Sequence, residues 1–428
     1  MRLKSNKDRL IAIVLIFVLF ALAQPGLALT LSDCIGSAFS GNETILYHQQ
    51  QVKAAELKVA EKKAAFLPRF GLSAGYTRLP YVSPSKATIL GGSLDDYSAS
   101  FTLSQPLYSG GSLLSDKAKA ELELAQARDS LQNAENDLYF DVASAYYTAR
   151  QAQEVLAAEK GFLNNLDAFY LKSKKLYDRT RSPRLEALLQ IEVQVGNAQQ
   201  DVEAAKNNYH KALRSLLELI YQDNESVILS DPLPLVAAAV EPTDLDETIL
   251  KNNYEYRQGL FGLKAAELDQ VIVRSALLPS LNLTGYYGWE WATWPPADGY
   301  SQWAVSLELL LFDFMGTAAK ADQAKSIYQQ NLTGLNILKR SLKKLYANTA
   351  DDLRSAGARL KLSKANLSKA EESLKLYQQR SASYTVNSRE LLDAEQAALQ
   401  AKMNCLSALL DYNLARIELQ RLRGEAKL

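Results

Sequence analysis

Cysteine and histidine are scarce in this chain of 428 residues, which contains two of each. Cys34 and Cys405 could form one bridge, but one bridge does not make a disulfide-based fold. We expect both to be free, buried thiols. His48 and His210 stand alone in the sequence, so the pattern predicts no metal site and no cofactor.

An excess of charge of either sign is also missing. The 48 basic and 48 acidic side chains cancel, so nothing in the charge indicates a nucleic-acid partner. The sequence has no phosphate-binding loop, no nucleophile elbow and no HExxH zinc motif. We therefore predict that the protein is not an enzyme and has no catalytic residues.

Long apolar runs are absent except at the N-terminus. Basic residues at positions 2, 4, 7 and 9 precede the apolar run Leu10–Leu22, and small residues follow it. This layout predicts a cleavable signal peptide over residues 1–28, with cleavage after Ala23 or after Ala28. An uncleaved anchor is the alternative, although the run is short for a spanning helix. No cysteine follows the run directly, so no lipid attachment is expected.

The rest of the chain contains two copies of one pattern. The letters KAAEL occur at Lys53–Leu57 and again at Lys264–Leu268, and the same interval separates Pro68 from Pro279. This predicts a signal peptide (1–28), a first structural repeat (29–221), a mid-rod linker or belt (222–244), a second repeat (245–424) and a short tail (425–428).

Each repeat carries two stretches in which apolar and polar residues alternate. The period of two predicts a strand pair over residues 69–105 and another over 280–311. Strands of about ten residues with aromatic ends are typical of an outer-membrane barrel, whose inner face is polar. Glu290 and Glu308 fall on the polar side, so we expect them to face a lumen. A half-buried antiparallel sheet in a soluble protein would show the same pattern.

Long helices follow each strand pair. The segment from Ser112 to about Tyr177 has no proline, and leucines recur every seven residues in both repeats, at 124, 131 and 138 and at 353, 360, 367 and 374. Heptads predict coiled coils. Breaks are expected at 178–184 and 384–390, and a shorter helix returns after each break.

Four strands cannot close a barrel, because such barrels begin at eight strands and an open edge cannot face lipid. Two copies of the chain would supply eight strands, and three copies would supply twelve. The fold class predicted is α+β, with a long helical coiled-coil barrel and four transmembrane strands per chain in a shared barrel.

The order of these motifs resembles the outer membrane efflux protein family, the TolC-like exit ducts of Gram-negative bacteria. The segments that carry the resemblance are QPLYSGG at 105–111, LLDAEQ at 391–396 and YTVNSR at 384–389. The resemblance implies a homotrimer with a twelve-stranded barrel in the outer membrane and a periplasmic tunnel. It also implies two partners, a periplasmic adaptor and an inner-membrane pump of the RND or ABC type. The cargo, whether drug, metal ion or polypeptide, is not indicated.

The resemblance also implies which residues form the gate and the adaptor contact. A periplasmic gate would comprise Tyr384, Arg389, Glu390 and Asp393, of which the last two share a helix face by spacing. The turns that contact the adaptor would comprise Thr180, Arg181, Ser182, Val386, Asn387 and Ser388.

Two other classes of protein stay open. A periplasmic adaptor would carry one coiled-coil hairpin and no aromatic-ended strand pairs, and a structural envelope tether would need no alternating strands. In the channel interpretation, the loops 79–95 and 292–300 are expected outside the cell. The alternative is that they fold into the lumen as a plug.

Overall fold

The computed structural model describes residues 28–90, 93–181, 185–224, 227–234, 247–292, 299–311, 313–382 and 388–424. Its elements are, in chain order, β1 (Ala28–Leu29), α2 (Leu31–Gly41), α3 (Glu43–Ala64), β2 (Arg69–Arg78), α4 (Pro84–Leu90), β3 (Asp95–Ser109), α5 (Ser112–Thr180), α6 (Leu185–Leu219), β4 (Ile228–Leu229), α7 (Glu247–Asn252), α8 (Tyr254–Ser275), β5 (Ser280–Trp291), β6 (Tyr300–Glu308), α9 (Gly316–Ala382) and α10 (Ser388–Leu422). The α+β fold class is confirmed. None of the described helices is both long and apolar enough to cross a membrane.

The chain divides into two compact units. One comprises residues 1–46, 133–252 and 343–428, and is called the helical unit below. The other comprises residues 47–132 and 253–342, and is called the sheet unit.

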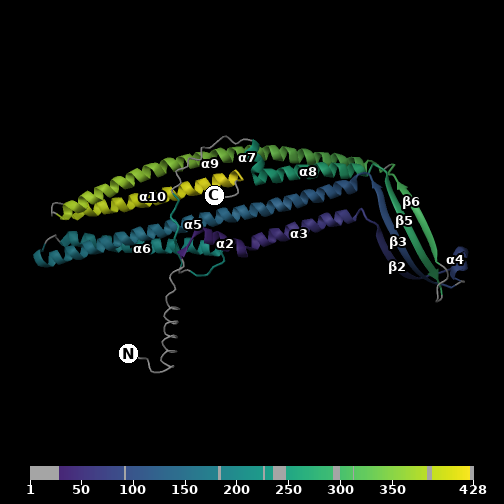
Figure 1. Ribbon diagram of the computed structural model, residues 1–428, viewed down its shortest axis with the longest axis horizontal. Helices are drawn as coiled ribbons and strands as arrows, with labels where there is room; N and C mark the ends of the chain where they lie inside the picture. Colours follow the sequence, from purple (N-terminus) through teal and green to yellow (C-terminus); the bar gives the residue numbers. More distant parts are fainter. Residues whose placement is uncertain are drawn as a thin grey trace, which may run out of the picture. The chain divides into compact units, whose positions relative to one another are not determined.

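The sheet unit contains one antiparallel sheet with the strand order β2-β3-β5-β6 (Figure 1). The register pairs Phe70 with Leu103, Leu103 with Gly285, and Gly285 with Trp303, so one face can be followed across all four strands. This face carries Phe70, Leu72, Ala74, Tyr76, Tyr97, Ala99, Phe101, Leu103, Leu281, Leu283, Tyr287, Trp289, Trp291, Trp303, Val305 and Leu307. The opposite face carries mainly serine, threonine, glycine and asparagine.

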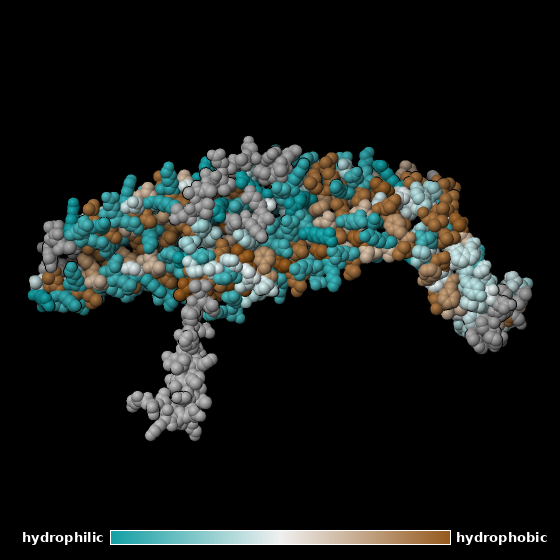
Figure 2. Space-filling model, viewed as in Figure 1, coloured by the Kyte–Doolittle hydropathy of each residue, from teal (hydrophilic) through white to brown (hydrophobic). Residues whose placement is uncertain are grey.

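The apolar face of the sheet is bare in a single chain. Phe70 is 82% exposed and Leu307 is 68% exposed, although burying such side chains is normally worth about 1.5–3 kcal/mol each. In Figure 2 the surface over the strands is brown and pale, with little of the teal that covers the helices. An apolar face of this size requires an apolar neighbour.

Each strand pair leads into the long helix that follows it through a turn with left-handed backbone. Between β3 and α5 the turn uses Gly110 and Gly111, with φ of 62° and 92°. Between β6 and α9 it uses Phe314 and Met315, with φ of 51° and 72°. Glycine adopts this conformation without strain, whereas residues with a side chain adopt it at a cost of about 1–2 kcal/mol each.

Ion pairs fasten the helices of the sheet unit to one another. Lys119 of α5 lies 2.6 Å from Asp269 of α8, and Arg257 of α8 lies 2.6 Å from Asp129 of α5. On α3, Lys58 lies 2.6 Å from Glu123 of α5. Helices α3 and α8 are therefore both held against the first part of α5.

The helical unit is built from paired helices with apolar seams. Leu156 of α5 packs against Val202 and Ala205 of α6. Tyr346 and Leu353 of α9 pack in one cluster with Leu419 of α10. In Figure 1, α6 runs beside α5 and α10 runs beside α9, as expected for two antiparallel coiled-coil hairpins.

A small parallel strand pair lies against α5. Ala28 and Leu29 of β1 pair with Ile228 and Leu229 of β4. Tyr146 of α5 is fully buried and its hydroxyl donates to the Leu29 carbonyl at 3.2 Å. Thr30 then begins α2 with a capping box that involves Asp33. Both cysteines are free and buried.

Candidate functional site

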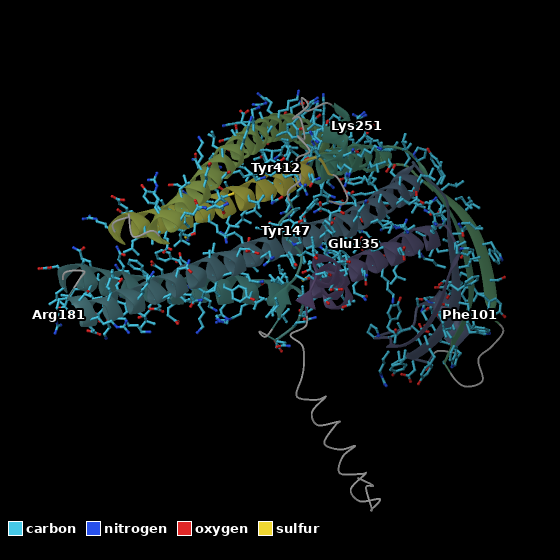
Figure 3. All side chains as sticks on the ribbon, turned by 60° about the vertical axis from the view of Figure 1, so that its left-hand side comes forward. Phe101, Glu135, Tyr147, Arg181, Lys251 and Tyr412 are labelled. Atoms are coloured by element: carbon cyan, nitrogen blue, oxygen red, sulfur yellow. The ribbon has the colours of Figure 1, made fainter. Side chains whose placement is uncertain are left out.

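The first turn predicted as a site lies at the end of α5. The Thr180 hydroxyl donates to the Leu176 carbonyl at 2.8 Å, which closes the last helical turn. Arg181, which Figure 3 labels at the end of α5, has a φ of 59°. Its guanidinium lies 5.3 Å from the centre of the Tyr177 ring. A cation over an aromatic ring at a helix C-terminus is favoured by both the ring and the helix dipole. Ser182 lies outside the described residues.

The second predicted turn leads into α10. Arg389, Glu390 and Asp393 are exposed in its first two turns. Leu392 is 7% exposed and packs with Leu166 of α5 and with Ile191 and Ala198 of α6. This apolar contact fixes the start of α10 and turns the charged side chains outward. Tyr384, Val386 and Asn387 lie outside the described residues, and so does the side chain of Ser388.

A groove runs between α6 and α10 at this end of the helical unit. Its lining contains both apolar and polar side chains, and two of the predicted gate residues belong to it. The lining residues are Glu186, Ala187, Leu189, Gln190, Ile191, Val193, Gln194, Arg389, Leu392 and Asp393. The structure thus brings Arg389 and Asp393 together with side chains of α6 that lie about 200 positions earlier.

An exposed apolar stripe on α6 was not identified from the sequence. Leu185, Leu189 and Val193 are 49%, 51% and 63% exposed. Their spacing of four residues places them on one helix face. The stripe could not be distinguished in the sequence from Leu188 and Ile191, which have the same chemistry and are buried.

A half-buried carboxyl group lies on α10, two residues after Asp393. Burial raises the pKa of Glu395 on α10, and a hydrogen bond from Gln378 of α9 partly opposes the shift. Glu159 of α5 shows the same effect, because burial and the nearby charge of Asp201 both raise its pKa. The helical pairs therefore contain carboxyl groups whose charged form is disfavoured by burial.

The two glutamates predicted to face a lumen lie on the polar face of the sheet. Glu308 pairs in register with Ser280 near one end of the strands. Glu290 pairs with Ser98 near the other end, and its carboxylate accepts a hydrogen bond from Lys86 at 2.6 Å. The structure does not bring these two carboxylates together.

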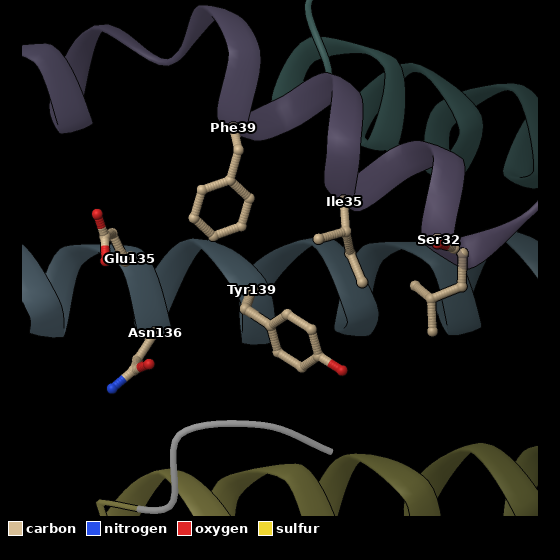
Figure 4. A pocket seen from close by; sticks show the side chains of 7 residues that line it. Ser32, Ile35, Phe39, Glu135, Asn136 and Tyr139 are labelled. Carbon is tan, nitrogen blue, oxygen red and sulfur yellow. The ribbon is translucent and has the colours of Figure 1, made fainter.

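A second groove lies between α2 and α5 in the helical unit. Figure 4 shows Ile35 and Phe39 projecting from α2 toward α5, which contributes Glu135, Asn136 and Tyr139. Its lining is mostly apolar and holds no charged pair. In the described part of the chain, no group of three or more His, Cys, Asp or Glu residues comes together to hold a metal ion.

Comparison with known proteins gives consistent results. The model of the family described as outer membrane efflux protein matches residues 34–220 and 245–425. Outer membrane protein TolC of Vibrio cholerae is 23% identical over 415 residues, which are 92% of this chain and 90% of that protein.

Solved structures of outer membrane channels share the fold. The Neisseria gonorrhoeae channel MtrE, determined in an open state, superposes with a TM-score of 0.76 at 20% identity, over 92% of this chain and 88% of that one. The Campylobacter jejuni channel CmeC gives a TM-score of 0.76 at 16% identity, over 92% and 85%. With the family model covering most of both halves, this chain is a member of the outer membrane efflux protein family.

Proposed function

We propose that the protein is a passive exit duct: a homotrimer in the outer membrane that passes molecules outward from an inner-membrane pump. One observation carries this proposal, namely a four-stranded sheet with one apolar face, one polar face and two open edges. The apolar face fits lipid and the polar face fits a water-filled lumen.

The open edges support assembly from several copies. Among the described strands, β2 and β6 each have a neighbour on one side only. In hydrocarbon, each unpaired backbone group costs several kcal/mol, so another chain must pair with both edges. Three copies supply the twelve strands that the family resemblance implies, and the chain reaches the membrane by way of a cleaved signal peptide over residues 1–28.

The ends of the helical hairpins form the gate in this proposal. Asp393 and Glu390 are exposed on α10, and Arg389 shares a groove with Asp393. Three copies would place three Asp393 carboxylates around one axis, where they would repel one another and attract cations. Tyr384 and Arg389 would hold neighbouring coils together against that repulsion.

The groove between α6 and α10 is the proposed docking site of the periplasmic adaptor. The exposed stripe Leu185, Leu189 and Val193 offers an apolar surface, and charged side chains also line the groove. This combination suits a partner helix. Thr180, Arg181, Ser182, Val386, Asn387 and Ser388 would flank the contact. The pump served, whether RND or ABC, and the cargo are left open by this argument.

Fractionation and conductance test the duct itself. The protein should be found in the outer membrane, should have three times the mass of one chain by native mass spectrometry, and should conduct ions in a planar bilayer. A soluble periplasmic monomer without conductance would overturn the proposal.

Variants test the gate. Asp393→Ala should weaken cation selectivity and block by divalent cations, because the ring loses its three carboxylates. Tyr384→Phe combined with Arg389→Ser should raise conductance by loosening the closed state. Unchanged conductance and selectivity in both variants would show that these residues do not form the gate.

A matched pair of variants tests the groove. Leu189→Asp places a charge in the exposed apolar stripe and should abolish co-purification with the adaptor, with trimer mass and conductance unchanged. Leu171→Asp alters a leucine of similar exposure, 55%, on α5 outside the groove, and should leave the complex intact. Equal loss with both variants would contradict the assignment.

A further inference from the structure

The loop between β2 and β3 contains a short helix that is tied to the sheet. Lys86 of α4 lies between two carboxylates: its Nζ is 2.5 Å from Asp96 of β3 and 2.6 Å from Glu290 of β5. Leu90, at the end of the same helix, is only 2% exposed. Figure 1 shows α4 beside the strand ends at which β2 leads into the loop and β3 begins.

The register identifies the face to which α4 is tied. Glu290 is paired with Ser98, and Asp96 lies two residues before Ser98, so both carboxylates project from the polar face. Thr77 of β2, which is paired with Asp96, belongs to the same face. Helix α4 is thus fastened to the face that would line the lumen, and the apolar face remains bare.

The electrostatics make Lys86 the residue on which this contact depends. The Asp96 side chain is 9% exposed, and one of its oxygens has no hydrogen-bond partner among the described residues. Hydrogen bonds to Asp96 and Glu290 raise the pKa of Lys86, so it stays charged. Without this cation, two carboxylates would face each other at short range and repel.

We propose that α4 is a latch that narrows the outer end of the channel, held closed by Lys86 between Asp96 and Glu290. This inference rests on the proposed duct, and it selects the alternative in which the loop after β2 folds toward the lumen. In a trimer, three latches would cover six carboxylates. Opening a latch would widen the mouth and expose those carboxylates to permeating ions, so the opened mouth would favour cations.

The latch is tested with Lys86→Gln (K86Q) and a matched control, Arg69→Gln (R69Q). Arg69 begins β2 and projects from the same polar face at the opposite end, since its register partner is Ser104. Both variants remove one positive charge from the lining. K86Q should raise single-channel conductance by about twofold or more and shift the reversal potential in a KCl gradient toward cation selectivity. R69Q should leave conductance near the wild-type value.

Hydrogen exchange followed by mass spectrometry gives a second readout that does not depend on conduction. Peptides that cover α4 should exchange faster in K86Q than in the wild type and R69Q. Unchanged exchange in K86Q would overturn the latch, whether or not the wild type forms a channel. Absence of channel activity in the wild type would overturn the proposed duct independently. Faster exchange with unchanged conductance would show that α4 is tied but does not narrow the mouth, and would also overturn the proposal.

Discussion

Replacing Tyr146 by phenylalanine should loosen the contact between the β1–β4 strand pair and α5. The Tyr146 hydroxyl donates to the Leu29 carbonyl at 3.2 Å and accepts from the Asp231 backbone N–H at 3.0 Å. Phenylalanine keeps the ring and removes both hydrogen bonds. The Leu29 carbonyl retains a bond from the Ser230 N–H at 3.2 Å, so the group that loses its partner is the Asp231 N–H.

The size of the effect follows from that one orphaned donor. An unpaired N–H costs about 1–3 kcal/mol when it is fully buried, and Asp231 is half-buried, so the lower part of that range applies. The free energy of local opening should fall by about 1–2 kcal/mol, which corresponds to exchange that is faster by about 5- to 30-fold. The effect should be confined to β1, β4 and the residues that follow them.

Hydrogen exchange of peptides that cover residues 28–34 and 227–234 measures this directly. Tyr147→Phe is the matched control, because Tyr147 is also buried and its hydroxyl makes no hydrogen bond among the described residues. Exchange in the control should stay within about a factor of two of the wild type. Equal rates in Tyr146→Phe and the wild type, or equal acceleration in both variants, would refute the reasoning.

Three further predictions concern other parts of the chain. Glu159→Gln should raise thermal stability at pH 8, because a carboxyl whose pKa is raised by folding destabilises the folded state when charged; the gain should shrink as pH falls toward the ordinary carboxyl value. Gly110→Ala should lower the free energy of unfolding by more than about 1 kcal/mol, since Gly110 has a φ of 62° and an added Cβ would lie 2.7 Å from the Ser275 carbonyl oxygen. Its control, Gly161→Ala, adds a Cβ in open space within α5 and should raise the free energy of unfolding by up to about 1 kcal/mol. Titration of the unreduced, unfolded protein should find two thiols, from Cys34 and Cys405; finding none would mean that they pair in the cell.

The strand faces could be predicted from the sequence because alternation is a local property. Phe70 and Leu72 share a face by spacing alone, and the register then aligns them with Leu103 and Phe101. Helix α4 could not be predicted in this way. Seven residues do not form a stable helix by themselves, and its position depends on a contact between Lys86 and Glu290, about 200 residues apart.

The candidate site was only partly accessible to sequence reasoning for the same reason. The resemblance pointed to Arg389 and Asp393, but their groove depends on the packing of Leu392 against Ile191. No local pattern joins α10 to α6. The strands β1 and β4 have two residues each, which is too short for a periodic pattern in the sequence.

The two open sheet edges have a genetic consequence. If each chain pairs its β2 with one neighbour and its β6 with the other, one chain with a defective β2 is enough to break the closed ring. A proline at Leu72 would remove a backbone donor from β2 and leave the rest of the chain able to assemble. Expressed in equal amounts with the wild type, such a chain would leave roughly one ring of three in eight free of the defect. The allele would therefore be dominant, and reduced channel conductance in outer membranes from a strain that carries both copies would reveal it.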